Sequence, residues 1–185
     1  MTELIVLVDE DGAPVGTAPK ASSHHDRTPL HLAFSAYVFD SQGRFLLTQR
    51  ALSKQTWPGV WTNSCCGHPM PDESNEQALH RRLDFELGLS ADEVTELLPD
   101  FRYRAELDGV VENEICPVFG VRVSGEPTLR PSEVEQSRWL DWDDVLSGRT
   151  PQLSPWCVLQ LRALAGHPGI ERLRAQAPAI RTGTT

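Results

Sequence analysis

Residues 67–89 read GHPMPDESNEQALHRRLDFELGL, and this segment predicts a loop followed by a helix with well-defined ends. Ser74 can cap the helix, and Gln77, three residues later, can bond back to it, as in a capping box. Gly88 follows Leu87 and suits the left-handed residue that terminates many helices. The sequence therefore predicts a helix that begins after Ser74 and ends at Leu87.

One side of this helix is predicted to be buried, because its leucines repeat every four residues. These are Leu79, Leu83 and Leu87. A neighbouring stripe contains Ala78, Arg82 and Glu86. Arg82 and Glu86 are four residues apart, and taken alone they indicate no more than a surface ion pair.

Short apolar runs separated by turns predict three β-hairpins. Their strands are expected at residues 4–8 and 15–18, 32–39 and 44–49, and 101–105 and 110–123. A strand at 137–142, a short helix at 143–146 and an amphipathic helix at 155–164 are expected to follow. Residues 19–29 contain two prolines, two serines and two histidines, and predict a loop that could fold over a site.

The length of the chain bounds the number of domains. With 185 residues, 39% of them hydrophobic, it is long enough for one core and short for two domains. We expect a single domain over residues 1–165. Residues 166–185 are rich in Gly, Pro, Arg and Thr, so a flexible C-terminal tail is expected there.

The charge and the cysteines exclude several classes of protein. The formal net charge is -9, from Lys+Arg 17 against Asp+Glu 26, which argues against nucleic-acid binding because that needs a basic surface. The chain starts without the basic region of a signal peptide, and no apolar stretch reaches the length of a membrane span. Four cysteines are too few for a disulfide scaffold. We expect a cytoplasmic protein with free thiols and no membrane partner; the sequence indicates no oligomeric state and is compatible with a monomer.

Glu112 and Glu114 lie two positions apart in the strand-like run VVENEICP, residues 110–117. Alternate residues of a strand share a face, so both carboxylates are expected to point the same way. Like charges on a half-buried face repel and resist desolvation, and a bound cation relieves both effects. Histidines that could complete the shell of such a cation are His24, His31 and His68. Taken alone, an acidic pair of this kind is more often a solvated face, and a single histidine is more often a surface or core residue.

The segment 67–89 resembles the Nudix box, a loop–helix–loop motif with the pattern G-x5-E-x7-R-E-U-x-E-E-x-G-U. The matching positions are Gly67, Glu73, Arg81, Glu86 and Gly88. Arg82 stands where the pattern has a glutamate, and Phe85 replaces another. A Nudix hydrolase needs these carboxylates to hold magnesium and activate water on a diphosphate. The resemblance therefore implies a protein that has the Nudix fold but lacks the carboxylates that a Nudix hydrolase uses for catalysis.

Several segments around this motif resemble the type 1 isopentenyl-diphosphate isomerases of the Nudix superfamily. They are LHLAFS (30–35), RALSK (50–54), WPGVWTNS (57–64), CGHP (66–69) and VENE (111–114). CGHP alone would be a weak signal, but the segments occur in the family's order and the likeness covers residues 4–164. The resemblance implies an α/β (α+β) fold, a Nudix-type mixed β-sheet flanked by helices, with the 19–29 loop closing over the site to exclude water.

The resemblance further implies an isomerase whose partner is a small molecule, isopentenyl diphosphate, which it converts to dimethylallyl diphosphate. The reaction adds a proton at C4 and removes one from C2, through positive charge at the tertiary C3. A proton donor and a proton acceptor are therefore needed on opposite sides of the substrate. By resemblance these are Cys66 and Glu114, and the sequence leaves open which of them donates first.

Two divalent-metal sites are also implied by the resemblance. The ligands of the first are His24, His31, His68, Glu112 and Glu114, a mixed set that suits Mn²⁺, Zn²⁺ or, under less selective conditions, Mg²⁺. His25 is adjacent to His24, but the spacing of seven residues before His31 favours His24. The second ion, Mg²⁺, would join the diphosphate to the Glu86 carboxylate and the backbone carbonyl of Cys66.

Four basic residues match the family's diphosphate clamp: Lys20, Arg50, Lys54 and Arg82. Trp156 matches an aromatic residue that faces the carbocation, where a ring stabilises positive charge without acting as a nucleophile. Tyr103 is expected to hydrogen-bond the catalytic carboxylate. Cys65, Cys116 and Cys157 are expected to be structural thiols.

Two other functions stay open on the sequence alone. The first is a Nudix diphosphohydrolase acting on a nucleotide or prenyl diphosphate, which Arg82 and Phe85 disfavour. The second is a non-catalytic module that binds a metal or a diphosphate, in which Cys66 and Glu114 would be structural.

Overall fold

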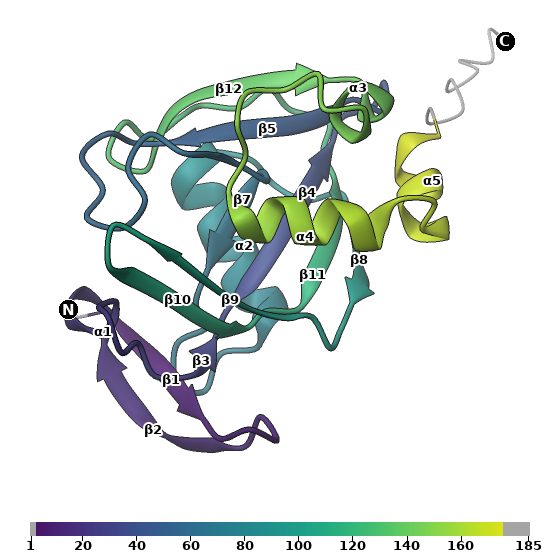
Figure 1. Cartoon of the computed structure of the whole chain (residues 1–185). Coiled ribbons are helices and arrows are strands. Elements are labelled where there is room, and N and C mark those ends of the chain that lie inside the picture. Colours follow the sequence, from purple (N-terminus) through teal and green to yellow (C-terminus); the bar gives the residue numbers. More distant parts are fainter. Residues whose placement is uncertain (1–2, 176–185) are drawn as a thin grey trace, which may run out of the picture.

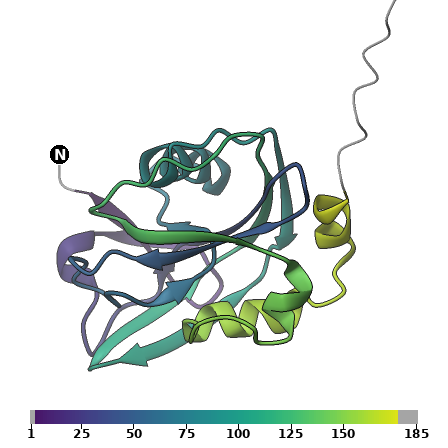
Figure 2. The ribbon, with the colours of Figure 1, turned by 90° about the horizontal axis from the view of Figure 1, so that it is seen from above.

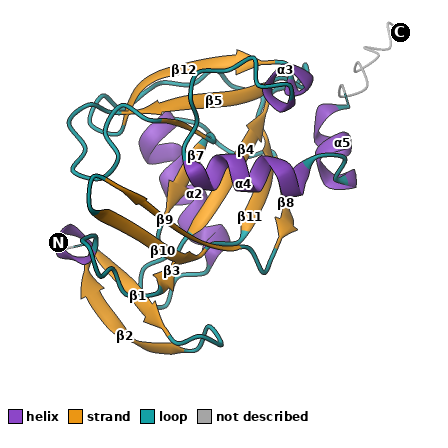
Figure 3. Ribbon diagram, viewed as in Figure 1, coloured by secondary structure: helices purple, strands orange, loops and turns teal. Residues whose placement is uncertain are grey.

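Two mixed β-sheets form the frame of the protein, as seen in the computed structural model, which describes residues 3–175 (Figures 1 and 3). The strand order of the first sheet is β2 (Pro14–Pro19), β1 (Leu4–Val8), β3 (His31–Leu32), β10 (Val110–Ile115) and β9 (Arg102–Leu107). β3 and β10 pair in parallel, whereas β10 and β9 form the predicted antiparallel hairpin.

The second sheet contains seven strands. Its main path is β12 (Val134–Leu140), β5 (Phe45–Arg50), β4 (Phe34–Phe39), β11 (Val118–Arg122) and β8 (Glu93–Leu98), while β6 (Trp61–Thr62) pairs with β5 and β7 (Cys65–Gly67) with β4. β4 and β11 run parallel, and β4 pairs antiparallel with β7. The predicted α+β fold with mixed β-structure flanked by helices is confirmed, and the strands form two sheets where one was predicted.

Helices cover both faces of the second sheet, with α2 (Asn75–Leu87) on one side and α4 (Pro155–Leu164) on the other (Figure 2). Alternate residues of β4 supply both interfaces. Phe34, Ala36 and Val38 belong to the core that contains the α2 leucines, and Tyr37 and Phe39 belong to the core around α4. Because both faces are covered, every residue of β4 is buried, and Ser35 is the one aliphatic polar side chain among them.

Helix α2 has the predicted ends. Ser74 and Gln77 form both bonds of the capping box, and Gly88 adopts φ 61°. Leu79, Leu83 and Leu87 are fully buried, and burial of each stabilises the fold by roughly 1.5–3 kcal/mol.

A bend divides two of the predicted strands. The strand predicted at 32–39 is β3 and β4 with Ala33 between them, and the strand predicted at 110–123 is β10 and β11 separated by Cys116 and Pro117. The two runs stay hydrogen-bonded through the bend, because the Ala33 amide donates to Ile115 O (2.9 Å) and the Ser35 amide to Pro117 O (3.0 Å). Pro117 itself has no amide hydrogen to contribute to a ladder.

Other element boundaries also differ from the sequence predictions. Part of the loop predicted at 19–29 forms the short helix α1 (Lys20–Ser23), and Trp142 opens helix α3 (Trp142–Leu146) instead of ending the preceding strand. Strands β6, β7 and β8 were not predicted. The first two are too short to show a periodicity, and in β8 polar residues alternate irregularly with apolar ones.

The prediction of a flexible tail from residue 166 is wrong for its first part. Residues 168–174 form helix α5 (Pro168–Arg174), and Ile170 and Leu173 are buried in the core that contains α4. The folded region thus extends past residue 165, and residues 176–185 lie outside the described part of the chain. Within residues 3–175, no helix has the length and apolarity that a membrane crossing requires.

Replacing Leu173 with alanine tests the contribution of α5. We expect Leu173→Ala to lower the free energy of unfolding by about 2–5 kcal/mol, because it leaves a cavity in the core. Urea denaturation measures the change, and Arg172→Ala, at an exposed position of the same helix, is the matched control. Equal stability of the two variants would contradict the packing of α5.

Candidate active site

A cavity of about 450 Å³ is lined by residues of both sheets and of helices α1, α2 and α4. Its wall contains most of the residues that the sequence marks as functional. The predicted thiol and carboxylate, the predicted basic clamp, and the predicted metal ligands other than His31 and Glu86 line it. His31 lies behind the wall and is fully buried.

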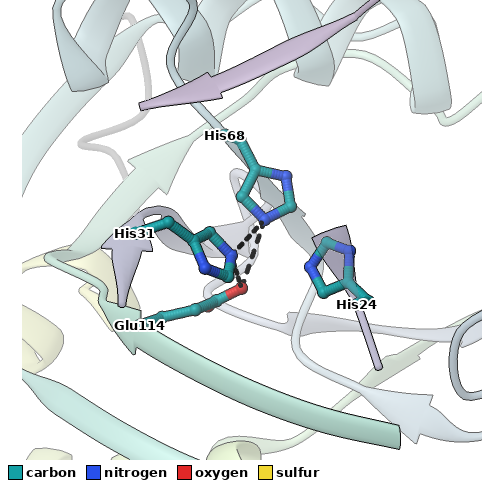
Figure 4. A group of neighbouring side chains, drawn as sticks. All are labelled: His24, His31, His68 and Glu114. Atoms are coloured by element: carbon teal, nitrogen blue, oxygen red, sulfur yellow. Dashed lines mark hydrogen bonds and ion pairs between the residues drawn. The ribbon is translucent and has the colours of Figure 1, made fainter. Parts of the chain in front are cut away.

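Three imidazoles and one carboxylate converge at one end of the cavity (Figure 4). His24 caps α1, His31 lies on β3, His68 directly follows β7, and Glu114 lies on β10. One nitrogen or oxygen from each lies within 4.8 Å of the others. Glu112 joins them through His24, since its Oε2 is 3.2 Å from His24 Nε2.

Hydrogen bonds determine which imidazole atoms face the centre of this cluster. His31 Nδ1 lies 2.9 Å from the carbonyl oxygen of Pro29, so Nδ1 carries a proton and Nε2 faces the cluster. His31 Nε2 is 3.2 Å from His68 Nε2 and 3.5 Å from Glu114 Oε1, and His68 Nε2 is 3.2 Å from the same oxygen. Two imidazole nitrogens and a carboxylate oxygen therefore crowd together in a buried space.

The donor set fits a divalent cation. Among residues 3–175, His68 Nδ1 is buried without a hydrogen-bond partner, and His24 Nε2 and Glu112 Oε2 face each other at 3.2 Å without forming a hydrogen bond. Burial lowers the pKa of His68 to about 3, which keeps this imidazole neutral and able to act as a ligand. A buried lone pair with no partner is costly, and a cation bound by imidazole and carboxylate groups removes that cost.

The two carboxylates of β10 ionise differently. Burial raises the pKa of Glu112, and the neighbouring charge of Glu114 raises it further. Burial also tends to raise the pKa of Glu114, but hydrogen bonds from His31 and His68 hold it well below its usual range. Glu114 is therefore an anion, and the Tyr103 hydroxyl donates a 2.7 Å hydrogen bond to its Oε2, as the sequence predicted for Tyr103.

His25 takes no part in this cluster. Its ring is half exposed and lies 3.3 Å from a carboxylate oxygen of Asp26. His24, on the other hand, has a buried ring that faces Glu112. The geometry thus agrees with the choice of His24 over its neighbour.

The Cys66 thiol lies on β7 at the wall of the cavity. Its Sγ donates to Asn63 Oδ1 at 3.1 Å and lies 3.5 Å from Ser35 Oγ. Burial raises the pKa of Cys66 to about 11, so the thiol keeps its proton at neutral pH. The cavity therefore contains a protonated thiol and an ionised carboxylate, the two kinds of group that a proton transfer needs.

Basic side chains occupy another part of the wall, and each has a partner. Lys20 pairs with Glu3 at 3.1 Å, and Lys54 and Arg82 both pair with Glu133. Arg50 donates to the carbonyl oxygens of Thr56 and Trp57. Arg82 also pairs with Glu86 at 2.6 Å.

Sequence reasoning missed Glu3 and Glu133. Neither belongs to a recognisable motif, and only the fold brings them to the basic residues. Glu86 lines a small hollow next to the main cavity, and this hollow also contains Cys66, Arg50 and Lys54. The structure thus brings together the predicted clamp, Glu86 and Cys66.

Comparison with known proteins agrees with this geometry. The NUDIX domain model matches residues 29–157. Proteins named Isopentenyl-diphosphate Delta-isomerase from Clavibacter michiganensis and Frankia alni are 52% and 51% identical to this chain. These alignments cover 97% and 92% of this chain, and 96% and 91% of the relatives. The chain belongs to the isopentenyl-diphosphate Delta-isomerase branch of the NUDIX family.

Solved structures show the same fold. A protein from Deinococcus radiodurans superposes with a TM-score of 0.68 at 20% identity, over 87% of this chain and 99% of that one. A MutT NUDIX hydrolase from Burkholderia pseudomallei gives a TM-score of 0.58 at 25% identity, over 73% of this chain and 98% of that one. The resemblance to the NUDIX family that the sequence predicted is confirmed.

Replacing His24 tests the metal cluster without touching the thiol. We expect His24→Ala to weaken binding of Mn²⁺ or Zn²⁺ at least about tenfold, because a ligand is lost. Metal content and titration measure the effect, and His25→Ala is the control because its ring points to Asp26 instead. Equal losses in both variants would show that the cluster is not the binding site.

Proposed function

We propose that this protein interconverts isopentenyl diphosphate and dimethylallyl diphosphate in the presence of a bound divalent metal. The observation that carries the proposal is the identity of about half the residues, over nearly the whole chain, to proteins named for this reaction. The contents of the cavity support it, since a thiol, a carboxylate and a group of basic residues line one space.

The reaction requires a specific set of groups. A proton is added to C4 of the unactivated alkene, C3 becomes positively charged, and the loss of a proton from C2 forms the new double bond. One enzyme group gives a proton and another takes one, so the enzyme ends each turnover with the same number of protons. Water must be excluded, because it would capture the cation.

Cys66 and Glu114 are the two proton-transfer groups in our proposal. The thiol is protonated and the carboxylate is ionised, so the ligand-free site has one group ready to give and another ready to take a proton. In the reverse reaction the two exchange roles. Tyr103 supports Glu114 through its hydrogen bond to Oε2.

We assign the divalent metal to His24, His31, His68, Glu112 and Glu114, and its donor types favour Mn²⁺ or Zn²⁺. An ion held there supplies positive charge that fixes Glu114 and tunes its acidity. A Mg²⁺ that arrives with the substrate suits Glu86 and the backbone carbonyl of Cys66, since both residues line the same hollow.

Binding of the diphosphate is assigned to the basic side chains of the wall: Lys20, Arg50, Lys54 and Arg82. The aromatic ring of Trp156 lies at the same cavity and packs 5.8 Å from the ring of Tyr103, centroid to centroid. A ring face stabilises a carbocation, and its carbon atoms do not attack it as water would.

The contacts of Arg82 disfavour the alternative of a diphosphohydrolase. Glu86 is the acidic residue of the Nudix cluster that this chain keeps, and both Nε and Nη2 of Arg82 bond to its Oε1. Where a hydrolase gathers carboxylates for magnesium and water, this site has a guanidinium instead. Phe85, the other departure from the motif, has a partly exposed ring beside Arg82 and Arg130.

Incubation with isopentenyl diphosphate in deuterated water tests the proposed activity. We expect deuterium in the dimethylallyl diphosphate, because the proton added at C4 comes from a group that exchanges with solvent. Mass spectrometry of the product and an assay for released phosphate are the measurements. Release of phosphate or pyrophosphate without labelled product would instead favour a hydrolase.

Replacing Cys66 separates the isomerase from a module that only binds. We expect Cys66→Ala to lower kcat by at least about a hundredfold, with folding and metal content retained, because a proton-transfer group is lost. Cys65→Ala is the matched control, since the adjacent thiol is buried against α2 and lies outside the main cavity. Unchanged turnover in Cys66→Ala would remove the thiol from the mechanism.

A further inference from the structure

Asn63 lies between β6 and β7 and is fully buried. Its side-chain nitrogen donates to two backbone carbonyl oxygens, Ala36 O at 3.1 Å and Cys65 O at 3.0 Å. These bonds link β4 to the start of β7. Carbonyl oxygens only accept hydrogen bonds, so the amide group must point its nitrogen toward them.

The oxygen of the same amide faces three donors. Asn63 Oδ1 accepts from Thr62 Oγ1 at 2.9 Å, from Cys66 Sγ at 3.1 Å and from Trp156 Nε1 at 3.2 Å. The indole nitrogen can only donate, which independently fixes the orientation of the amide. One buried oxygen atom therefore contacts both the thiol and the aromatic ring of the cavity.

We propose that Asn63 is a positioning residue for the isomerisation, holding the Cys66 thiol and the Trp156 ring in fixed places around the five-carbon group. This inference rests on the proposed function. Asn63 acts through its two neighbours and is not a catalytic residue, because it lines only the small adjacent hollow and its amide atoms bond to protein groups. Its amide oxygen is a common anchor for the group that transfers a proton and the ring that faces the positive charge.

The Trp156 ring and the Cys66 thiol each have contacts besides the hydrogen bond to Asn63, and these contacts do not replace it. Packing limits the Trp156 ring, which meets Trp57 edge to face with centroids 5.1 Å apart. Its Nε1–H bond to Asn63 sets the rotation of the ring within that packing. The thiol has one further contact, Ser35 Oγ at 3.5 Å, and that hydroxyl is itself held by Gln160 at 2.9 Å. The shorter of the two thiol contacts is the one to Asn63.

A purely structural role for Asn63 makes a different prediction. If the amide served only to bond the two carbonyl oxygens, its loss would lower stability and reduce the amount of folded enzyme. Each folded molecule would then work normally. A positioning role lowers kcat in the folded fraction and changes KM less, because the side-chain hydrogen bonds of Asn63 go to groups other than the basic residues assigned to the diphosphate.

Asn63→Ala tests the proposal, with Thr62→Val as the matched control. The control removes another hydrogen bond to the same Oδ1, together with a 2.9 Å contact to Ser154 Oγ, and leaves the thiol and indole bonds in place. We expect kcat per folded Asn63→Ala molecule to fall by roughly a hundredfold, as small misplacements of reacting groups do, with KM within about threefold of the parent. Thr62→Val should keep kcat near the parent value.

A second measurement tests the hydrogen bond between Asn63 and Trp156 directly, without an activity assay. The indole N–H resonance of Trp156, assigned in ¹⁵N-labelled protein with Trp156→Phe, should shift in Asn63→Ala and stay in place in Thr62→Val. If Asn63→Ala does not fold, Asn63→Gln keeps the amide but displaces its oxygen, and the same shift and fall in kcat are expected.

Two results would overturn the inference. One is an indole resonance that does not move in the Asn63 variant, and the other is a kcat equal to that of Thr62→Val. If the parent protein makes no dimethylallyl diphosphate, the proposed function fails, and the positioning role in isomerisation fails with it. If the parent isomerises and the Asn63 variant does so equally well, only the positioning role fails.

Discussion

The parallel pairing of residues 31–39 with residues 114–122 is the contact on which the site depends. Glu114 is the register partner of His31 in the first sheet, and Val118 is the partner of Ser35 in the second. On its other edge, Ser35 pairs with Cys66. One run of chain, bent at residue 33, therefore sets the positions of both the carboxylate and the thiol. The bend directs the run from one sheet into the other, and the cavity is lined from both sheets because of it.

The electrostatics of the cavity explain how an acidic chain can hold an anion. With a net charge of -9, the chain cannot attract a diphosphate through its average surface. Four of its basic residues instead line one cavity, and Glu3, Glu86 and Glu133 pair with three of them, Lys20, Lys54 and Arg82. Pairing avoids the cost of burying free charges. A diphosphate with Mg²⁺ could take over these contacts, because phosphate oxygens replace carboxylate oxygens and the ion compensates the displaced glutamates.

Local signals could be predicted from the sequence, and features created by distant contacts could not. The capping box of α2 and the shared face of Glu112 and Glu114 depend on residues within a few positions, and both are present. The pairing of Glu133 with Lys54 and Arg82 joins residues more than fifty positions apart, and no motif marks it. Helix α5 was mistaken for a tail because of its glycine and proline, although its buried residues Ile170 and Leu173 are spaced as on a helix. In that segment tertiary packing outweighs composition.

The altered Nudix box divides by position into a part that shapes the loop and a part that faces the site. Arg81 makes two 2.7 Å hydrogen bonds to Glu73 and one to the carbonyl oxygen of His68, so these two motif residues hold the loop that carries His68, a predicted metal ligand. Gly67 is needed for space, since a Cβ there would lie 2.8 Å from Arg82 Cγ and 2.9 Å from the Phe34 ring. The residues that match the motif therefore include those that set backbone geometry, while Arg82, which departs from it, lines the cavity. The loop and helix that position carboxylates in a hydrolase position a guanidinium and an imidazole in this protein.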